Sequence, residues 1–292
     1  MRLDDKMLKE FEEYLKTQDF TENTIKSYTK DVELFMRWYI DTTGQEFLPE
    51  NLTEFDLVEY KSYLLRQNLK PSTVNRSIIS LRKFVHFLLD RGLLKKDIST
   101  RLKQVKDTTR NLSPVVLDKK DIYKFRRTVH QFGKARDVAL VELLLNTGMR
   151  ISEAINLKLE DVELSERKGK VKIWGKGRSY REVPLNSDAR KYLSEYLKKR
   201  PYSETNYFFV TSTGKPLTRN AAYKIILKYA KLASVDLHPH MLRHFFAQTL
   251  IDKGLNLYDV QQLLGHQRIE TTLRYKKPNV QLQEEMVENL LE

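Results

Sequence analysis

The sequence of 292 residues contains no cysteine and only six histidines. The lack of cysteine excludes disulfides and cysteine-ligated zinc. Of the six histidines, only His240 and His244 have a helical spacing at which two could share a metal, and no third ligand is evident. We therefore expect a protein that works without a metal or any other cofactor.

Long apolar stretches are also missing. No run approaches the roughly 20 residues that a membrane-spanning helix needs, and the first residues, MRLDDKMLKEFEEYL, are amphipathic and do not resemble a signal peptide. We therefore expect a soluble, cytoplasmic protein. Hydrophobic residues make up 40% of the chain, which is enough to build cores. With domains of roughly 100 to 200 residues, the length predicts two domains.

Charge is unevenly distributed along the chain, whose formal net charge is +13. Residues 1–60 carry 7 Lys and Arg against 15 Asp and Glu, a net charge of −8. Residues 61–110 carry 13 against 3, a net of +10, and residues 111–292 carry 32 against 21, a net of +11. This distribution indicates that one face meets a polyanion such as nucleic acid. A basic surface that only faces solvent would give the same composition.

Over the first hundred residues, apolar side chains recur at helical spacing and predict four helices. They lie near residues 8–15, after a capping Thr21, around residues 54–67, and from Ser72 as a cap after Pro71 to a stop at Gly92. Three basic residues of the fourth helix lie off its apolar stripe: Arg76, Arg82 and Lys83. They would either contact nucleic-acid phosphates or face solvent.

The segment from Lys95 to about Pro114 is polar and basic and has no periodicity, which is typical of an interdomain linker. Beyond it the pattern predicts a buried helix that ends at Gly148, another helix from Arg150, and a hairpin over residues 169–185. Further helices are predicted at about residues 187–199, 218–233, 239–253, 256–264 and 269–276, with a short amphipathic helix at the end of the chain. The expected fold class is therefore mainly α with a small antiparallel β-sheet.

Two stretches of the second half place a cation where it could meet a phosphate. In TGMRISE, Arg150 stands at the start of a helix, where backbone amides already favour an anion, and its guanidinium can donate two hydrogen bonds to a phosphate. The alternative is a salt bridge to Glu153. Lys176 lies between two glycines in the hairpin turn, from which it could swing into a site or simply be solvated.

Two further stretches add groups that move protons. In HPHMLRHFFAQTL, His240 and Arg243 are three residues apart and share one face of a predicted helix, as phosphate ligands or as a core histidine with a chance neighbour. In LLGHQRIETTLRYKK, His266 follows a helix end, and Tyr275 lies among basic residues that lower the cost of forming a phenolate. A lone tyrosine would usually be half-buried packing, so its company makes it a candidate nucleophile.

Together these stretches resemble the tyrosine recombinases of the phage integrase family, in particular the compact Xer-like and transposon-resolving members. The resemblance covers nearly the whole chain, and the family's six site positions fall on Arg150, Lys176, His240, Arg243, His266 and Tyr275. It implies a two-domain clamp on DNA, with a helical, SAM-like core-binding domain at residues 1–106, a linker at 107–113, and a catalytic domain at 114–292 that carries a C-terminal oligomerisation helix.

The resemblance also implies a mechanism. Tyr275 would attack a DNA phosphate to form a 3′-phosphotyrosyl bond, and strand exchange would proceed through a Holliday junction. The two arginines would neutralise charge on the nonbridging oxygens. Lys176 would protonate the leaving 5′-oxygen, His240 would help Tyr275 lose its proton, and His266 would hydrogen-bond the phosphoryl group.

The implied partners are double-stranded DNA with an inverted-repeat core site and three further copies of the chain, which form a homotetramer on two sites. A second recombinase or an accessory protein is a further partner that the sequence leaves open. Leu282, Met286 and Leu290 form an apolar stripe that must be buried, either on a neighbouring subunit by exchange of C-terminal helices or on its own domain.

Competing interpretations also follow from these residues. A type IB topoisomerase or a hairpin telomere resolvase uses similar groups, and a DNA-binding regulator could retain the fold without the reaction. Within recombination, the biological role could be resolution of dimers or cointegrates, or integration and excision of a mobile element.

Overall fold

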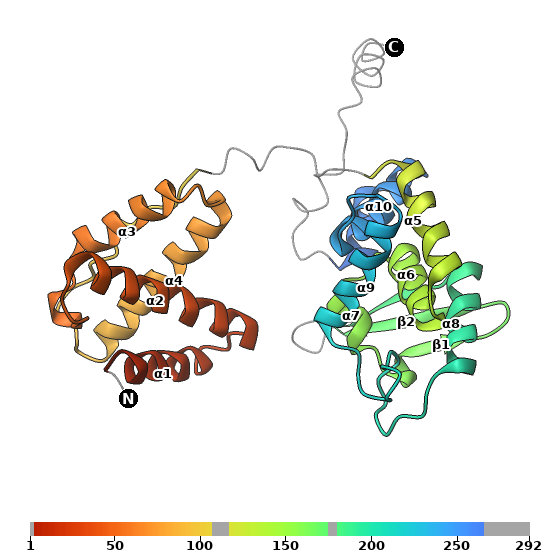
Figure 1. The fold of residues 1–292 in the computed structure, drawn as a ribbon, viewed down its shortest axis with the longest axis horizontal. Helices are drawn as coiled ribbons and strands as arrows, with labels where there is room; N and C mark the ends of the chain where they lie inside the picture. The colour runs from red at the N-terminus through yellow and green to blue at the C-terminus, as the bar shows by residue number, and fades with distance from the viewer. Residues whose placement is uncertain (1–2, 107–116, 175–179, 266–292) are drawn as a thin grey trace, which may run out of the picture. The chain divides into compact units, whose positions relative to one another are not determined.

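The computed structural model describes residues 3–106, 117–174 and 180–265 (Figure 1). These residues form helices and one three-stranded antiparallel sheet, so the predicted fold class, mainly α with a small antiparallel sheet, is confirmed. The chain divides into two compact units, Met1–Arg110 and Asn111–Glu292. None of the described helices is both long and apolar enough to cross a membrane.

The first unit is helical, and all four predicted helices are present. Its elements are α1 (Leu3–Lys16), α2 (Glu22–Thr43), the short 3-10 helix η1 (Pro49–Asn51), α3 (Glu54–Arg66) and α4 (Pro71–Asp90). Thr21 caps α2, as predicted, by accepting a hydrogen bond from the Thr24 backbone. The predicted start of α4 was wrong by two residues: Lys70 and not Ser72 is the cap, and the helix begins at Pro71, because proline suits a first helical position whose N–H has no partner within the helix.

The basic segment that follows α4 packs on the first unit. Ile98 and Leu102 are buried in its core. Asn75 of α4 holds Val105 through two hydrogen bonds of 2.7 and 2.9 Å, and Arg82 donates to the Leu102 carbonyl at 2.8 Å. The prediction of a linker that begins at Lys95 is therefore wrong, since much of this polar stretch is hydrogen-bonded to the helices before it.

Basic side chains of α4 make more contacts within the first unit than the sequence indicates. Arg76 donates two hydrogen bonds to the buried carboxylate of Asp31, at 2.8 and 3.0 Å, and Ser80 donates a third. Lys83 lies over the ring of Phe20, 5.5 Å from its centroid. These basic side chains therefore stabilise the first unit, whatever else they contact.

The second unit contains helices around a small sheet. Its elements are α5 (Lys119–Phe132), α6 (Ala135–Thr147), α7 (Ile151–Asn156), the 3-10 helix η3 (Leu159–Asp161), β1 (Val162–Leu164), β2 (Gly169–Trp174), β3 (Tyr180–Pro184), α8 (Ser187–Lys199), α9 (Arg219–Leu232), α10 (Pro239–Asp252) and α11 (Leu257–Leu264). The predicted hairpin is confirmed as β2 and β3. Sequence reasoning missed α5 and the three-residue β1. The predicted helices at 269–276 and at the end of the chain lie outside the described residues.

Helix α6 organises the second unit. It runs through the interior of that unit (Figure 1) and packs against α8 and α10, and every residue from Asp137 to Leu145 is buried. The sheet follows the register Val171 opposite Val183 and Ile173 opposite Arg181. Because alternate residues of a strand face opposite sides, Arg181 lies on the same, core-facing side as Val183. The C-terminus of α6 and the inner face of β3 frame the site described below.

Candidate active site

The junction between α6 and α7 positions the first candidate arginine. Gly148 ends α6 in a left-handed conformation, with φ of +60°. Arg150 then caps α7, and its backbone N–H donates to Glu153 Oε2 at 2.7 Å while its Nη1 donates to Glu153 Oε1 at 2.9 Å. The salt bridge considered as an alternative is thus present. With 42% of its side chain exposed, Arg150 is also accessible to an anion from solvent.

Arg243 of α10 is the most deeply buried charge of the site, with 2% of its side chain exposed. It donates from Nη1 to the Gly148 carbonyl and from Nη2 to the Leu264 carbonyl, both at 2.8 Å. These carbonyls stand at the C-terminal ends of α6 and α11, where the helix dipole favours a cation. Its Nη1 also lies 4.0 Å from Glu153 Oε2. Arg243 therefore joins three helices at the point where the site is formed.

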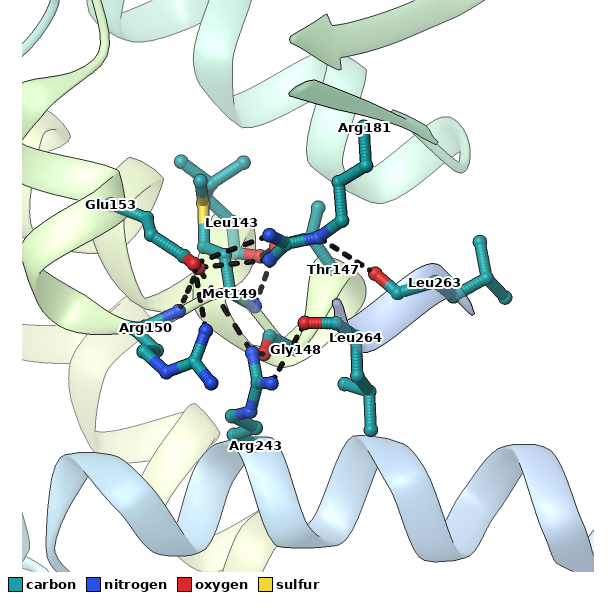
Figure 2. Close-up of polar contacts among 10 residues, drawn as sticks. All are labelled: Leu143, Thr147, Gly148, Met149, Arg150, Glu153, Arg181, Arg243, Leu263 and Leu264. Atoms are coloured by element: carbon teal, nitrogen blue, oxygen red, sulfur yellow. Dashed lines mark hydrogen bonds and ion pairs between the residues drawn. The ribbon is translucent and has the colours of Figure 1, made fainter. Parts of the chain in front are cut away.

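Glu153 is the hub of these contacts (Figure 2). Arg181 of β3 donates to both of its carboxylate oxygens, at 3.2 and 2.9 Å, and from Nε to the Leu263 carbonyl at 3.0 Å. Burial alone would raise the pKa of Glu153, but the hydrogen bonds and charge of Arg181 and the contacts from Arg150 outweigh it and leave the pKa below its ordinary value. Glu153 is therefore ionised at neutral pH.

His240 lies one helical turn before Arg243 on α10. Partial removal of its ring from water lowers the pKa of His240, and the positive charges of Arg243 and Arg150 lower it further. His240 as a whole remains exposed to solvent, and the two guanidinium charges still lower its pKa. His240 is therefore neutral near pH 7 and able to accept a proton.

Neither His240 nor its neighbour is arranged as a metal ligand in the described chain. The ring of His244 meets that of His240 edge to face, with centroids 4.9 Å apart. No group of three His, Asp or Glu side chains that could hold a metal ion occurs among the described residues. What the described site offers is cationic: three guanidinium groups surround one carboxylate, an arrangement suited to a phosphate.

The structure thus brings Arg150, His240 and Arg243 into one site. The other three candidates, Lys176, His266 and Tyr275, lie outside the described residues. The structure describes the residues next to Lys176 and His266. Strand β2 ends before residues 175–179 and β3 begins after them, and Gly265 follows α11 directly before His266.

Sequence reasoning missed Arg181 and gave Glu153 only the part of a salt-bridge partner. A signal for Arg181 was present in the alternating segment YREVP, because the arginine occupies the same side of the strand as Val183. A charge on the core-facing side of a strand requires a buried partner. The pattern does not reveal which acid provides it.

The chain is similar to known proteins over most of its length. Residues 116–281 match the model of the phage integrase family, and residues 8–92 match that of the phage integrase N-terminal SAM-like domain. The chain is 32% identical to the TnP I resolvase of Bacillus thuringiensis over 284 residues, which cover 95% of this chain and 98% of the resolvase. It is 34% identical to the tyrosine recombinase XerD of Listeria innocua over 264 residues, 87% of each chain.

One similar solved structure is that of the site-specific recombinase XerH bound to palindromic difH substrate in a post-cleavage complex. It has a TM-score of 0.75 at 26% identity, and the match covers 92% of this chain and 80% of the XerH chain. The Tn1549 transposon integrase in complex with transposon right end DNA has a TM-score of 0.74 at 18% identity, covers 97% of this chain and 98% of its own, and shows a likeness of fold alone.

Proposed function

This chain belongs to the phage integrase family and is a tyrosine-type site-specific recombinase, and we propose that it cuts and rejoins DNA through a 3′-phosphotyrosyl intermediate. The Tyr275 hydroxyl oxygen attacks the scissile phosphorus, and the bond from phosphorus to the 5′-oxygen breaks. The freed 5′-hydroxyl then attacks the phosphotyrosine of a partner strand and releases the tyrosine, so that two such exchanges form and resolve a Holliday junction.

The observation that carries this proposal is the cationic site at the end of α6. Arg150 and Arg243 would bind the nonbridging oxygens, whose charge grows in the transition state. Loss of one such preorganised donor costs about 100- to 1,000-fold in rate. His240, whose pKa is lowered, would accept the proton of Tyr275. Lys176 would protonate the leaving 5′-oxygen, and His266 would donate a hydrogen bond to the phosphoryl group.

The proposed substrate is double-stranded DNA with an inverted-repeat core site. XerH is described as bound to a palindromic substrate, which supports a site of this symmetry for the present chain. Residues 1–106 would form the core-binding domain, 107–113 the linker and 114–292 the catalytic domain. The match of residues 8–92 to the SAM-like domain supports the first of these assignments.

We further propose that four copies assemble on two sites by exchange of C-terminal segments. The stripe of Leu282, Met286 and Leu290 needs an apolar receptor. A groove of about 680 Å³ in the second unit includes Phe246 and Leu250 of α10 in its lining. Lys119, Arg126 and Lys253 also line the groove, and the C-terminal segment carries Glu284, Glu285 and Glu288, so the charges of the two would be complementary.

Deletion of residues 280–292 tests the exchange. Recombination should be lost while binding to a single site stays within about twofold of the full chain, because the deletion removes assembly and leaves DNA contacts. If the deleted protein recombines at the full rate, the segment does not assemble the tetramer. If it recombines slowly and unfolds at lower denaturant than the full chain, the segment packs on its own domain.

The biological role is proposed to be resolution of joined DNA molecules, such as dimers or cointegrates. The similarity to a protein named a resolvase, over almost the full length of both chains, favours resolution over integration and excision of a mobile element. A second recombinase or an accessory protein would be an additional requirement.

The test uses a plasmid with two copies, in direct repeat, of the site that the protein selects from a random-sequence duplex pool. Resolution into two circles without Mg²⁺ or ATP, abolished by Tyr275→Phe, is the expected result. Relaxation of a supercoiled plasmid that lacks the site would favour a type IB topoisomerase. Site binding without any strand breakage would favour a DNA-binding regulator.

A further inference from the structure

A third arginine, Arg181, lies inside the site and has no role in the mechanism above. It projects from the core-facing side of β3, with 15% of its side chain exposed, opposite Ile173 of β2. Its guanidinium reaches Glu153 with two nitrogens and the Leu263 carbonyl with the third (Figure 2). Each of its three guanidinium nitrogens therefore donates to a protein acceptor.

We infer that Arg181 is a positioning residue that neutralises Glu153 and so keeps the charges of Arg150 and Arg243 available for the phosphate, an inference that rests on the proposed function. All three arginines face the same carboxylate. Glu153 Oε1 accepts from Arg150 Nη1 at 2.9 Å and from Arg181 Nη1 at 3.2 Å. Glu153 Oε2 accepts from the Arg150 backbone at 2.7 Å and from Arg181 Nη2 at 2.9 Å, and it lies 4.0 Å from Arg243 Nη1.

The charge count shows what Arg181 contributes. Glu153 and Arg181 sum to zero, so Arg150 and Arg243 leave two positive charges at the site. A phosphodiester carries one negative charge, and the pentavalent transition state carries a second on its nonbridging oxygens. Without Arg181 the described site has one net positive charge, and the buried carboxylate competes with the phosphate for the remaining guanidinium groups. The loss falls mainly on the transition state, because its charge is greater.

A second contact of Arg181 reaches the chain just before His266. The hydrogen bond from Nε to the Leu263 carbonyl, 3.0 Å long, fixes the last turn of α11. A Cβ atom on Gly265 would lie 2.8 Å from Arg181 Nη1, so the guanidinium packs closely on the glycine backbone. Arg181 thus ties together the strand that begins four residues after Lys176, the carboxylate that holds Arg150, and the residue that precedes His266.

The alternative is that Arg181 only staples the fold, and the two roles differ in their response to a second substitution. If neutralisation matters, Arg181→Gln reduces the net charge of the site to one. Adding Glu153→Gln then removes the competing carboxylate and returns the net charge to two. The double variant should therefore be faster than Arg181→Gln alone. If Arg181 is only a staple, the slow rate of Arg181→Gln comes from unfolded protein, so the rate per folded molecule, with the folded fraction taken from urea unfolding, equals that of wild type in both variants.

The measurement is single-turnover formation of the covalent adduct on a nicked duplex that carries the selected inverted-repeat site, with the affinity for the intact duplex measured in parallel. For Arg181→Gln we expect adduct formation to slow about 100-fold, with the DNA dissociation constant changed less than about threefold. Adding Glu153→Gln should restore about tenfold of this rate, as expected for an electrostatic effect that operates in the transition state.

Arg181→Lys is the variant that protects the test against misfolding, since it keeps the charge but not the fork of donors. Its rate should lie within about tenfold of wild type. Arg200→Gln is the matched control: Arg200 also lies in the second unit and donates to the backbone carbonyls of Thr205, Tyr207 and Phe208, away from the site. The folded Arg200 variant should form the adduct at the wild-type rate.

Three results would overturn the inference. The first is a wild-type rate for Arg181→Gln, and the second is a double variant as slow as or slower than Arg181→Gln. The third is a loss in Arg181→Lys as large as that in Arg181→Gln, since charge would then not be the cause. If wild type itself gives no adduct that depends on Tyr275, the proposed function fails and this inference fails with it.

Discussion

Gly148 provides a test of how tightly the end of α6 holds the site. Replacing it with alanine adds one methyl group at a residue with φ of +60°, a conformation that costs a residue with a Cβ about 1 to 2 kcal/mol. The new Cβ would lie 2.3 Å from Phe246 Cδ1 and 2.8 Å from Leu264 Cδ2. Overpacking of a well-filled core costs about 1 to 3 kcal/mol more. The free energy of unfolding should therefore fall by about 2 to 5 kcal/mol in total.

The matched control is Gly254→Ala. Gly254 lies in the same unit with φ of +90°, and a Cβ there would meet nothing within 4 Å. This variant should lose only the conformational part, about 1 to 2 kcal/mol. The difference between the two variants isolates the clash with Phe246 and Leu264.

Urea unfolding followed by tryptophan fluorescence gives the measurement. The chain has two tryptophans, Trp38 in the first unit and Trp174 in the second, so a Trp38→Phe background reports the second unit alone. Gly148→Ala should also slow adduct formation, since the Gly148 carbonyl accepts a hydrogen bond from Arg243. Equal losses of stability at the two glycines would refute the account of packing at this junction.

Three further outcomes are expected. In an NMR titration the pKa of His240 should lie below 6.5, and Arg150→Gln should raise it by removing a positive charge; an unchanged value would exclude electrostatic coupling between them. Arg126→Gln should lower the free energy of unfolding by about 3 kcal/mol, because it strips a bidentate partner from the fully buried Glu142; a change under about 1 kcal/mol, typical of a surface pair, would contradict this. Because the pKa of Glu153 is lowered on folding, its ionised form contributes stability above pH 4.5 that is lost as the pH falls through the folded pKa. The stability gap between wild type and Glu153→Gln should therefore shrink in acid unfolding, and a gap that grows would reverse the assigned shift.

Much of the fold could be predicted because its determinants are local. Thr21 caps the start of α2, Gly148 ends α6, and the placement of His240 and Arg243 on one helix follows from their spacing. Helix α5 carried the same kind of signal in Ile122, Phe125 and Val129, which are buried at helical spacing, but basic residues separate them. The apolar spacing was therefore sufficient to predict α5, but the basic residues between the apolar ones obscured that spacing.

Contacts between distant segments could not be predicted. Arg181 and Glu153 are 28 residues apart, and nothing in either segment specifies the other. The packing of residues 95–105 was hidden for a similar reason, because it depends on hydrogen bonds from Asn75 and Arg82 to backbone groups. Composition reports how polar a segment is and not whether its backbone is held. The assignments of Lys176, His266 and Tyr275 remain predictions from sequence.

The proposed mechanism requires Tyr275 to form a covalent bond to DNA without a metal. The most direct measurement incubates the protein in EDTA with a nicked duplex of the selected site, separates protein bound to DNA on a denaturing gel, and identifies the modified peptide by mass spectrometry. We expect a DNA-linked peptide that contains Tyr275 and no adduct from Tyr275→Phe. An adduct on another residue, or one that persists in Tyr275→Phe, would contradict the proposed mechanism.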